Sequence, residues 1–231
     1  MNPIQVIFFD YYMTLVELND PFAKISGWFE RFLTQSHPEI DLIKFNQKFT
    51  RNRVIIYSEP VFRLGIDILL LSLEKTCNDL GIPGYGDNFR PFIEELFSTP
   101  KAYEDSAATV AALKQNYKVG LLTNADNYIL QRSLSRQPFR FDFVITSEDA
   151  QCNKPGKAIF DYALTQLNIS SQEAVMAGDS LFDDISGAHN AGIHSIWVNR
   201  KNEPLKEGLQ PPEYTVRSLR EIPDLFPLVE L

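Results

Sequence analysis

An aspartate ends the first apolar run of the chain. Residues 4–9 are typical of a buried strand, and Asp10 follows them directly. An ionised carboxylate at the end of a core strand is costly unless a cation, hydrogen bonds or chemistry compensates it. Ligands of open α/β sheets bind in the crevice beyond the carboxyl ends of the strands. Asp10 is therefore a candidate nucleophile or metal ligand, and the alternative is an aspartate that merely begins a turn.

Polar residues follow later apolar runs in the same way. They are Thr123 and Asn124, and then Asp179, Ser180, Asp183 and Asp184 after Gly178; between these two sets, Lys154-Pro155 stands just before a predicted helix. Each has a structural explanation by itself, as a helix N-cap, a solvated cation or an acid in the first turn of a helix. Together they would bring a hydroxyl, an amide, an ammonium and several carboxylates to one edge of a sheet. Such a convergence predicts a catalytic crevice.

The segments that would position these residues form two kinds of pattern. Residues 20–98 show successive helical periodicities, the first opened by the N-cap pair Asp20-Pro21. From residue 102 strands alternate with helices: strands are predicted at 118–123, 141–146, 174–178 and 194–198, and a short helix is predicted at 185–191. This alternation predicts an α/β fold with a doubly wound, Rossmann-like parallel sheet. The core would comprise residues 1–15 and 99–231, and residues 16–98 would form an inserted all-helical cap domain over Asp10. Within the core, residues 202–231 are expected to pack around the sheet edge.

Composition narrows the possible partners and compartment. The net charge of −8, with scattered basic residues, argues against nucleic acid and membrane as partners. Cys77 and Cys152 match no metal-ligand spacing, and no signal sequence precedes the first strand. The sequence therefore predicts a cytoplasmic protein with reduced thiols and a small-molecule substrate. It does not distinguish a monomer from a homodimer.

The ordered motifs resemble those of the haloacid dehalogenase-like (HAD) hydrolase superfamily, in its helical-cap subclass. The motifs are Asp10 with Thr14, Thr123-Asn124, Lys154-Pro155, and Gly178-Asp179-Ser180 with Asp184. The resemblance implies that Asp10 attacks the substrate and forms an aspartyl ester, which water then hydrolyses.

The resemblance also implies roles for the other motif residues. Thr14, Thr123 and Asn124 would bind the transferred group, and Lys154 would steady the nucleophile and the developing charge. The ion would be Mg²⁺, held by Asp10, Asp179 and the main-chain carbonyl of Tyr12, with Asp184 supporting this shell. A hard cation with oxygen ligands is the usual partner of phosphoryl transfer.

Tyr12 departs from the pattern. Most phosphatases of the superfamily carry a second aspartate here as general acid and base, and Met13 stands where a glycine is usual. General acid catalysis contributes about 10²–10⁴-fold. A tyrosine could donate a proton, but it is a poor base for activating water. The sequence therefore predicts a preference for good leaving groups, such as acyl or aryl phosphates.

Two other functions remain open. Tyrosine at position 12 is similar to the 2-haloacid dehalogenases, whose leaving halide needs no proton and which use no Mg²⁺. The crowding of Asp10, Asp179 and Asp184 around Lys154 favours a magnesium-dependent phosphatase instead, because a divalent cation relieves the repulsion between carboxylates. The substrate would then be a phosphorylated metabolite in preference to a haloacid. A catalytically silent binding module is the third hypothesis; Tyr12 and Met13 favour it, and the retention of Asp10, Lys154 and Asp179 opposes it.

Substrate choice would depend on the cap. Four residues on its predicted helices could meet an anion, although exposed arginines are usually solvated: Arg51, Arg53, Tyr57 and Arg63. Four aromatic residues have the spacing of a packed face and are predicted to form the cap core: Phe22, Trp28, Phe29 and Phe32.

Overall fold

A six-stranded sheet lies at the centre of the structure, a computed structural model that describes residues 3–225. Every neighbouring pair of its strands is parallel. In spatial order the strands are β5 (Phe143–Thr146), β4 (Lys118–Thr123), β1 (Val6–Phe9), β6 (Ala174–Gly178), β7 (His194–Val198) and β8 (Tyr214–Val216). Strands later in the chain extend outward on both sides of β1. The winding therefore reverses at β1, which is where such sheets bind ligands.

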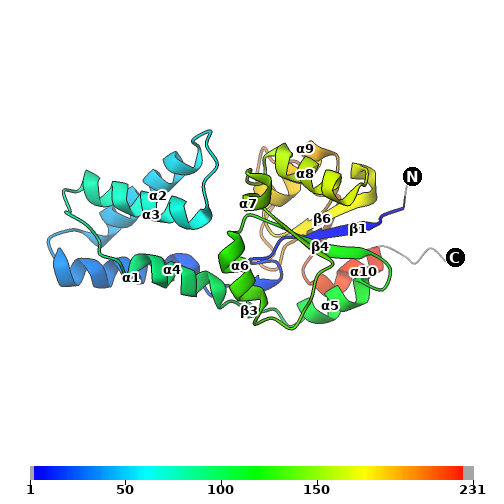
Figure 1. The fold of residues 1–231 in the computed structure, drawn as a ribbon, viewed down its shortest axis with the longest axis horizontal. Helices are drawn as coiled ribbons and strands as arrows, with labels where there is room; N and C mark the ends of the chain where they lie inside the picture. Colours follow the sequence, from blue (N-terminus) through cyan, green and yellow to red (C-terminus); the bar gives the residue numbers. More distant parts are fainter. Residues whose placement is uncertain (1–2, 226–231) are drawn as a thin grey trace.

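Helices cover both faces of the sheet (Figure 1). Successive residues of β1 alternate between the two faces. Ile7 and Phe9 lie on the face covered by α5 (Ser106–Leu113) and α10 (Ile222–Leu225), whereas Val6 and Phe8 lie on the face covered by α8 (Lys157–Leu167) and α9 (Gly187–Ala191). All four of these residues are fully buried. The doubly wound parallel sheet predicted from the sequence is confirmed. The helical elements of this core are α5 (Ser106–Leu113), α6 (Asn127–Leu134), α7 (Ser147–Ala150), α8 (Lys157–Leu167), η1 (Ser171–Glu173), η2 (Leu181–Ser186), α9 (Gly187–Ala191), η3 (Leu219–Glu221) and α10 (Ile222–Leu225).

An all-helical unit lies between β1 and β4 in the sequence and beside the sheet in space (Figure 1). As predicted, Asp20 caps its first helix and accepts a hydrogen bond from the Ala23 amide at 2.9 Å. Phe29, Phe45 and Phe89 are fully buried in its apolar centre. The four helices are α1 (Pro21–Ser36), α2 (Leu42–Tyr57), α3 (Gly65–Asp79) and α4 (Phe89–Ser98).

Phe22 does not belong to the apolar core of the cap, so the prediction for this residue was wrong. Trp28, Phe29 and Phe32 pack in the helical cluster, but the Phe22 side chain is 63% exposed. Phe22 lies in the first turn of α1, where its ring meets the guanidinium of Arg53 instead of apolar side chains, at 5.2 Å from the ring centroid.

A short ribbon connects the two units. The chain passes from the sheet to the helical unit through β2 (Val16–Glu17) and back through β3 (Lys101–Ala102), and these two strands pair antiparallel. We propose this ribbon as the junction between cap and core.

Two parts of the C-terminal half differ from the expected elements. Residues 214–216 form the edge strand β8, which extends the sheet beyond β7. The helix expected at 185–191 begins earlier, as the π-helical segment η2. Residues 226–231 of the expected edge-packing tail lie outside the described residues. Among residues 3–225, no helix is both long and apolar enough to cross a bilayer.

Candidate active site

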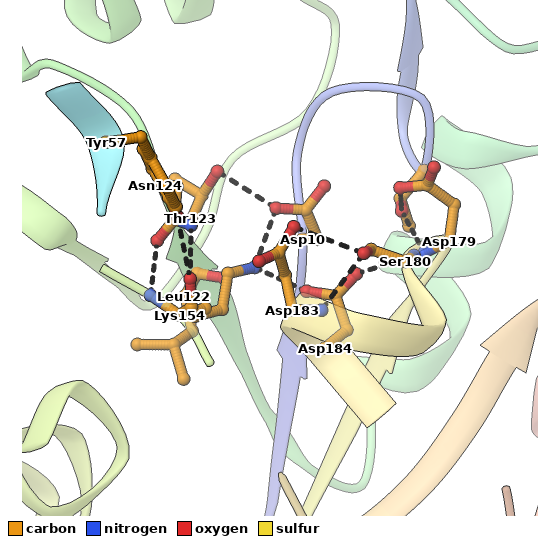
Figure 2. Close-up of polar contacts among 11 residues, drawn as sticks. Asp10, Tyr57, Leu122, Thr123, Asn124, Lys154, Asp179, Ser180, Asp183 and Asp184 are labelled. Carbon is orange, nitrogen blue, oxygen red and sulfur yellow. Dashed lines mark hydrogen bonds and ion pairs between the residues drawn. The ribbon is translucent and has the colours of Figure 1, made fainter. Parts of the chain in front are cut away.

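The carboxyl ends of β1, β4 and β6 bring the predicted site residues together (Figure 2). Phe9 pairs in register with Leu121 of β4 and with Ala177 of β6. Asp10 therefore emerges between the segment that carries Thr123 and the segment that carries Asp179.

Lys154 is buried at the centre of this group. Its side chain is 1% exposed, and Nζ donates to Asp10 Oδ1 at 2.8 Å, to Asp184 Oδ1 at 2.6 Å and to the Leu122 carbonyl at 2.8 Å. Burial alone would lower the pKa of Lys154, but the charges of Asp10 and Asp184 outweigh it, so this pKa is raised. The interpretation of Lys154 as a solvated cation is therefore wrong. The lysine is a charged, fully paired centre.

Three carboxylates crowd around this single cation. Oxygens of Asp10, Asp179 and Asp184 lie within 4.8 Å of one another. Burial, together with the charge of Asp10, raises the pKa of Asp184 to about 7. Burial and then the charges of Asp10 and Asp184 raise the pKa of Asp179 to about 8. The group therefore holds more negative charge than Lys154 alone stabilises.

The oxygen set fits a hard divalent cation. Oxygens bound to one Mg²⁺ at about 2.1 Å lie at most about 4.2 Å apart, so small side-chain movements would close the three carboxylates around an ion. Asp179 is held at its main-chain oxygen, which accepts from Trp197 Nε1 at 2.9 Å. Asp184 Oδ2 accepts from the Ser180 amide at 3.0 Å. A Cβ at Gly178 would lie 2.2 Å from this Oδ2, so only glycine allows the approach.

The hydroxyl and amide groups of the site bind neighbouring parts of the crevice. Thr123 Oγ1 donates to Asp10 Oδ1 at 3.1 Å, and Thr14 Oγ1 donates to Asp179 Oδ1 at 3.2 Å. Asn124 is bonded to the main chain of Lys154 twice, from Nδ2 to the carbonyl at 2.9 Å and from the Lys154 amide to Oδ1 at 2.7 Å. Its side chain therefore holds the loop that carries the lysine.

Ser180 and Asp183 fit their structural explanations. Ser180 is the N-cap of η2, and its Oγ accepts from the Asp183 amide at 3.0 Å. Asp183 lies outside the three-carboxylate group.

Tyr12 has its own hydrogen-bond partner. Its hydroxyl donates to the Phe97 carbonyl at the end of α4, at 2.9 Å. Burial, with added repulsion from Tyr11, Asp126 and Asp10, raises the pKa of Tyr12 well above its usual value. The hydroxyl is thus a weaker acid than an ordinary tyrosine. Next to it, Met13 has φ of 64°, a left-handed conformation that favours glycine and costs another residue about 1–2 kcal/mol.

Arg200 binds the main chain of the loop that follows Asp10. Its Nη2 donates to the Thr14 carbonyl at 2.9 Å, and the guanidinium binds Asp105 through both nitrogens at 2.9 and 3.0 Å. Burial alone would raise the pKa of Asp105, but hydrogen bonds from Arg200, Ser218 and the Leu219 amide hold it below its usual value. This partly buried ion pair holds the loop against the end of the sheet.

Comparison with known proteins identifies the family to which this chain belongs. Residues 69–198, more than half of the chain, match the model of the haloacid dehalogenase-like hydrolases. The chain belongs to this family. It is therefore a HAD hydrolase, as the motifs predicted.

The relatives of this HAD hydrolase include a nucleotidase and a haloacid dehalogenase. The pyrimidine 5'-nucleotidase YjjG of Escherichia coli (strain K12) is 38% identical over 138 residues, which cover 58% of this chain and 61% of YjjG, less than two thirds of either. The (S)-2-haloacid dehalogenase 1 of Pseudomonas sp. (strain CBS-3) is 23% identical over 233 residues, 98% of both chains. Among solved structures, the putative HAD hydrolase YfnB of Bacillus subtilis, bound to magnesium, superposes with a TM-score of 0.74 at 17% identity, covering 98% of this chain and 100% of YfnB.

The cap of this HAD hydrolase is bound to the core by contacts that sequence reasoning missed. The Tyr57 hydroxyl donates to the Lys154 carbonyl at 3.2 Å (Figure 2). The Asp126 carboxylate accepts from the Gly65 amide at 2.6 Å and the Ile66 amide at 2.8 Å. It thereby caps α3, whose own N-cap residue makes no side-chain bond. In the sequence, Asp126 looks like an N-cap of α6, so no signal identified it.

A cavity of about 630 Å³ lies between cap and core of this HAD hydrolase. Asn124 and Asp183 line its core side, and Arg53 and Tyr57 line its cap side. Of the other predicted cap residues, Arg51 borders a separate surface hollow and Arg63 pairs with Glu59 at 2.7 Å.

Proposed function

We propose that this HAD hydrolase is a magnesium-dependent phosphatase that acts on a small phosphorylated metabolite through an aspartyl ester on Asp10. The main support is the group of three carboxylates around Lys154, two of which have raised pKa values. A divalent cation would let all three ionise. A haloacid carboxylate that arrived without a metal would add a further negative charge to the group.

The contacts of Asp10 support its role as nucleophile. Oδ1 is bonded to Lys154 and Thr123, and no hydrogen bond to Oδ2 is found within residues 3–225. Oδ2 is therefore the oxygen that attacks phosphorus as the bond to the leaving oxygen breaks. Water then cleaves the aspartyl phosphate, which releases inorganic phosphate and restores Asp10. Lys154 and Thr123 keep the carboxylate oriented in both steps.

The ion would be held by Asp10, Asp179 and the main-chain oxygen of Tyr12, with Asp184 supporting them. Bound Mg²⁺ supplies positive charge to the oxygens of the transferred phosphoryl group. Thr14 keeps Asp179 in place, and Asn124 keeps Lys154 in place.

Tyr12 limits the range of substrates. Its raised pKa and its bond to Phe97 make it a weak proton donor, so the leaving oxygen must depart as an anion. The enzyme should therefore prefer aryl and acyl phosphates to alkyl phosphates.

The test is a set of aryl phosphates, alkyl phosphates and 2-haloacids, each assayed with and without a chelator. We expect phosphate release that requires Mg²⁺ and is faster for aryl than for alkyl substrates. Equal rates for both phosphate classes would contradict the role given to Tyr12. Halide release that survives the chelator would favour the second candidate, a 2-haloacid dehalogenase, which Tyr12 and the full-length dehalogenase relative support. Release of neither phosphate nor halide from any compound would support the third candidate, a catalytically silent binding module.

Asp126→Ala should loosen the cap over the site. Loss of the two amide contacts should lower the free energy of unfolding by about 1 kcal/mol. It should also raise KM for an aryl phosphate several-fold, with a smaller change in kcat, because the cap closes the substrate cavity. Thermal unfolding and steady-state kinetics measure the two effects.

Asp41→Ala is the matched control for this prediction. Asp41 caps α2 at its exposed end by accepting from the Lys44 amide at 2.8 Å. Its loss should cost similar stability and leave KM unchanged. Equal KM values for the two variants would show that the Asp126 contact does not position the cap.

A further inference from the structure

The cavity between cap and core contains the guanidinium of Arg53. Arg53, on α2, makes no ion pair among the residues that the structure describes, and its guanidinium lies over the Phe22 ring at 5.2 Å. The two carboxylates that line the same cavity are engaged elsewhere. Asp126 accepts from two amides of α3, and Asp183 Oδ2 accepts from Ser180 Oγ at 3.2 Å. The charge of Arg53 is therefore available to a ligand.

The walls of the cavity are mainly apolar and come from several helices. Phe22 adds an aromatic ring at 63% exposure, which leaves a large apolar face in contact with solvent. Such a ring is a suitable platform for a planar ligand. Six apolar residues of the wall are Ile25, Ile68, Leu69, Ile93, Phe97 and Ile129.

The floor of the cavity is next to the chemistry. Three residues close to Asp10 line this side of the cavity: Tyr12, Met13 and Asn124. Asn124 also binds the main chain of Lys154. A leaving group attached to a phosphate at Asp10 would therefore extend along the apolar wall toward Arg53.

We propose that Arg53 and Phe22 select a phosphomonoester whose leaving group is an aromatic ring that carries a carboxylate. The ring packs against Phe22 and the apolar wall, and Arg53 binds the carboxylate. This inference rests on the proposed phosphatase function and adds the class of its substrate.

The probes are 4-carboxyphenyl phosphate and its neutral counterpart, 4-carbamoylphenyl phosphate. The quantity measured is the ratio of kcat/KM for the acid to kcat/KM for the amide, in wild type and in Arg53→Gln. Dividing one enzyme's ratio by the other's removes the intrinsic reactivity of each ester. We expect the acid-to-amide ratio to be about tenfold or more lower in Arg53→Gln than in wild type, mainly because KM for the acid rises. A tenfold change corresponds to the loss of one charge-assisted hydrogen bond.

Two further variants separate the roles. Arg51 lies on the same helix as Arg53 but borders a different hollow, so the acid-to-amide ratio of Arg51→Gln should equal that of wild type. Phe22→Ala should lower kcat/KM several-fold for both aryl esters without changing their ratio.

Binding of 4-hydroxybenzoate and of 4-hydroxybenzamide, measured by calorimetry, tests the cavity without turnover. Stronger binding of the acid that is lost in Arg53→Gln would support the cavity assignment even if neither ester were hydrolysed, in which case only the phosphatase function would fail. Hydrolysis of both esters with the same ratio in wild type and Arg53→Gln, with no difference in binding, would overturn the inference and leave the phosphatase function in place.

Discussion

Asp10→Asn should lower kcat for an aryl phosphate by about 10⁴-fold or more, since the amide cannot attack phosphorus. The fold should persist, because an amide oxygen can still accept the hydrogen bonds that Lys154 and Thr123 now give to Oδ1. Lys154 would also keep its contact with Asp184. Steady-state kinetics measures the loss, and mass spectrometry of rapidly quenched enzyme should detect a phosphate adduct on wild type only.

Asp142→Asn makes the same chemical change far from the site. Asp142 pairs with Lys114 at 2.8 Å, at the opposite end of the sheet from Asp10, and its substitution should leave kcat unchanged. An Asp10→Asn enzyme that kept more than about a hundredth of wild-type turnover would rule out covalent catalysis by this residue.

Tyr12→Asp should have the second largest effect, and it should be a gain. A carboxyl group at this position can give a proton to the leaving oxygen and then activate water, so turnover of an alkyl phosphate should rise by about 10²–10⁴-fold. Aryl phosphates should gain less, because their leaving oxygen is already stable as an anion. The ratio of the two rates measures the effect.

Tyr12→Phe distinguishes the ring from the hydroxyl. It removes only the bond to the Phe97 carbonyl and keeps the edge contacts with Tyr11 at 4.9 Å and Phe97 at 5.5 Å between ring centroids. If the hydroxyl donates no proton, aryl phosphate turnover should stay close to wild type. A large loss in Tyr12→Phe, with no gain in Tyr12→Asp, would make Tyr12 the proton donor and contradict our proposal.

The sheet and the residues at its edge could be predicted from sequence for one physical reason. Strands covered on both faces are almost continuously apolar, so a polar residue such as Asp10 or Thr123 marks the end of a strand. Parallel strands end at the same edge, which brings distant positions together without knowledge of their order. Asp179 follows β6 and could be placed in the same way, whereas Lys154 lies beyond α7 and the sequence placed it only as a residue just before a helix.

The contacts between cap and core could not be predicted, because they depend on the relative position of two units. Asp126 has the sequence context of a helix cap, and only the structure shows that the helix it caps is α3. Phe22 fits the periodicity of the buried face of α1, but that face continues past the end of the cap core, where the ring meets Arg53. Periodicity identifies a face of a helix and not what lies opposite it.

Tyr57 has a consequence for how this enzyme could acquire new substrates. The residue lines the cavity, and its hydroxyl shares the Lys154 carbonyl with the Asn124 amide. A substitution that reshapes the cavity at position 57 would also remove a restraint from the peptide that carries the buried lysine. A change of substrate range at this position therefore conflicts with preservation of the rate. Divergence should proceed more freely through Phe22 and Arg53, for which residues 3–225 show no bond to the Lys154 peptide.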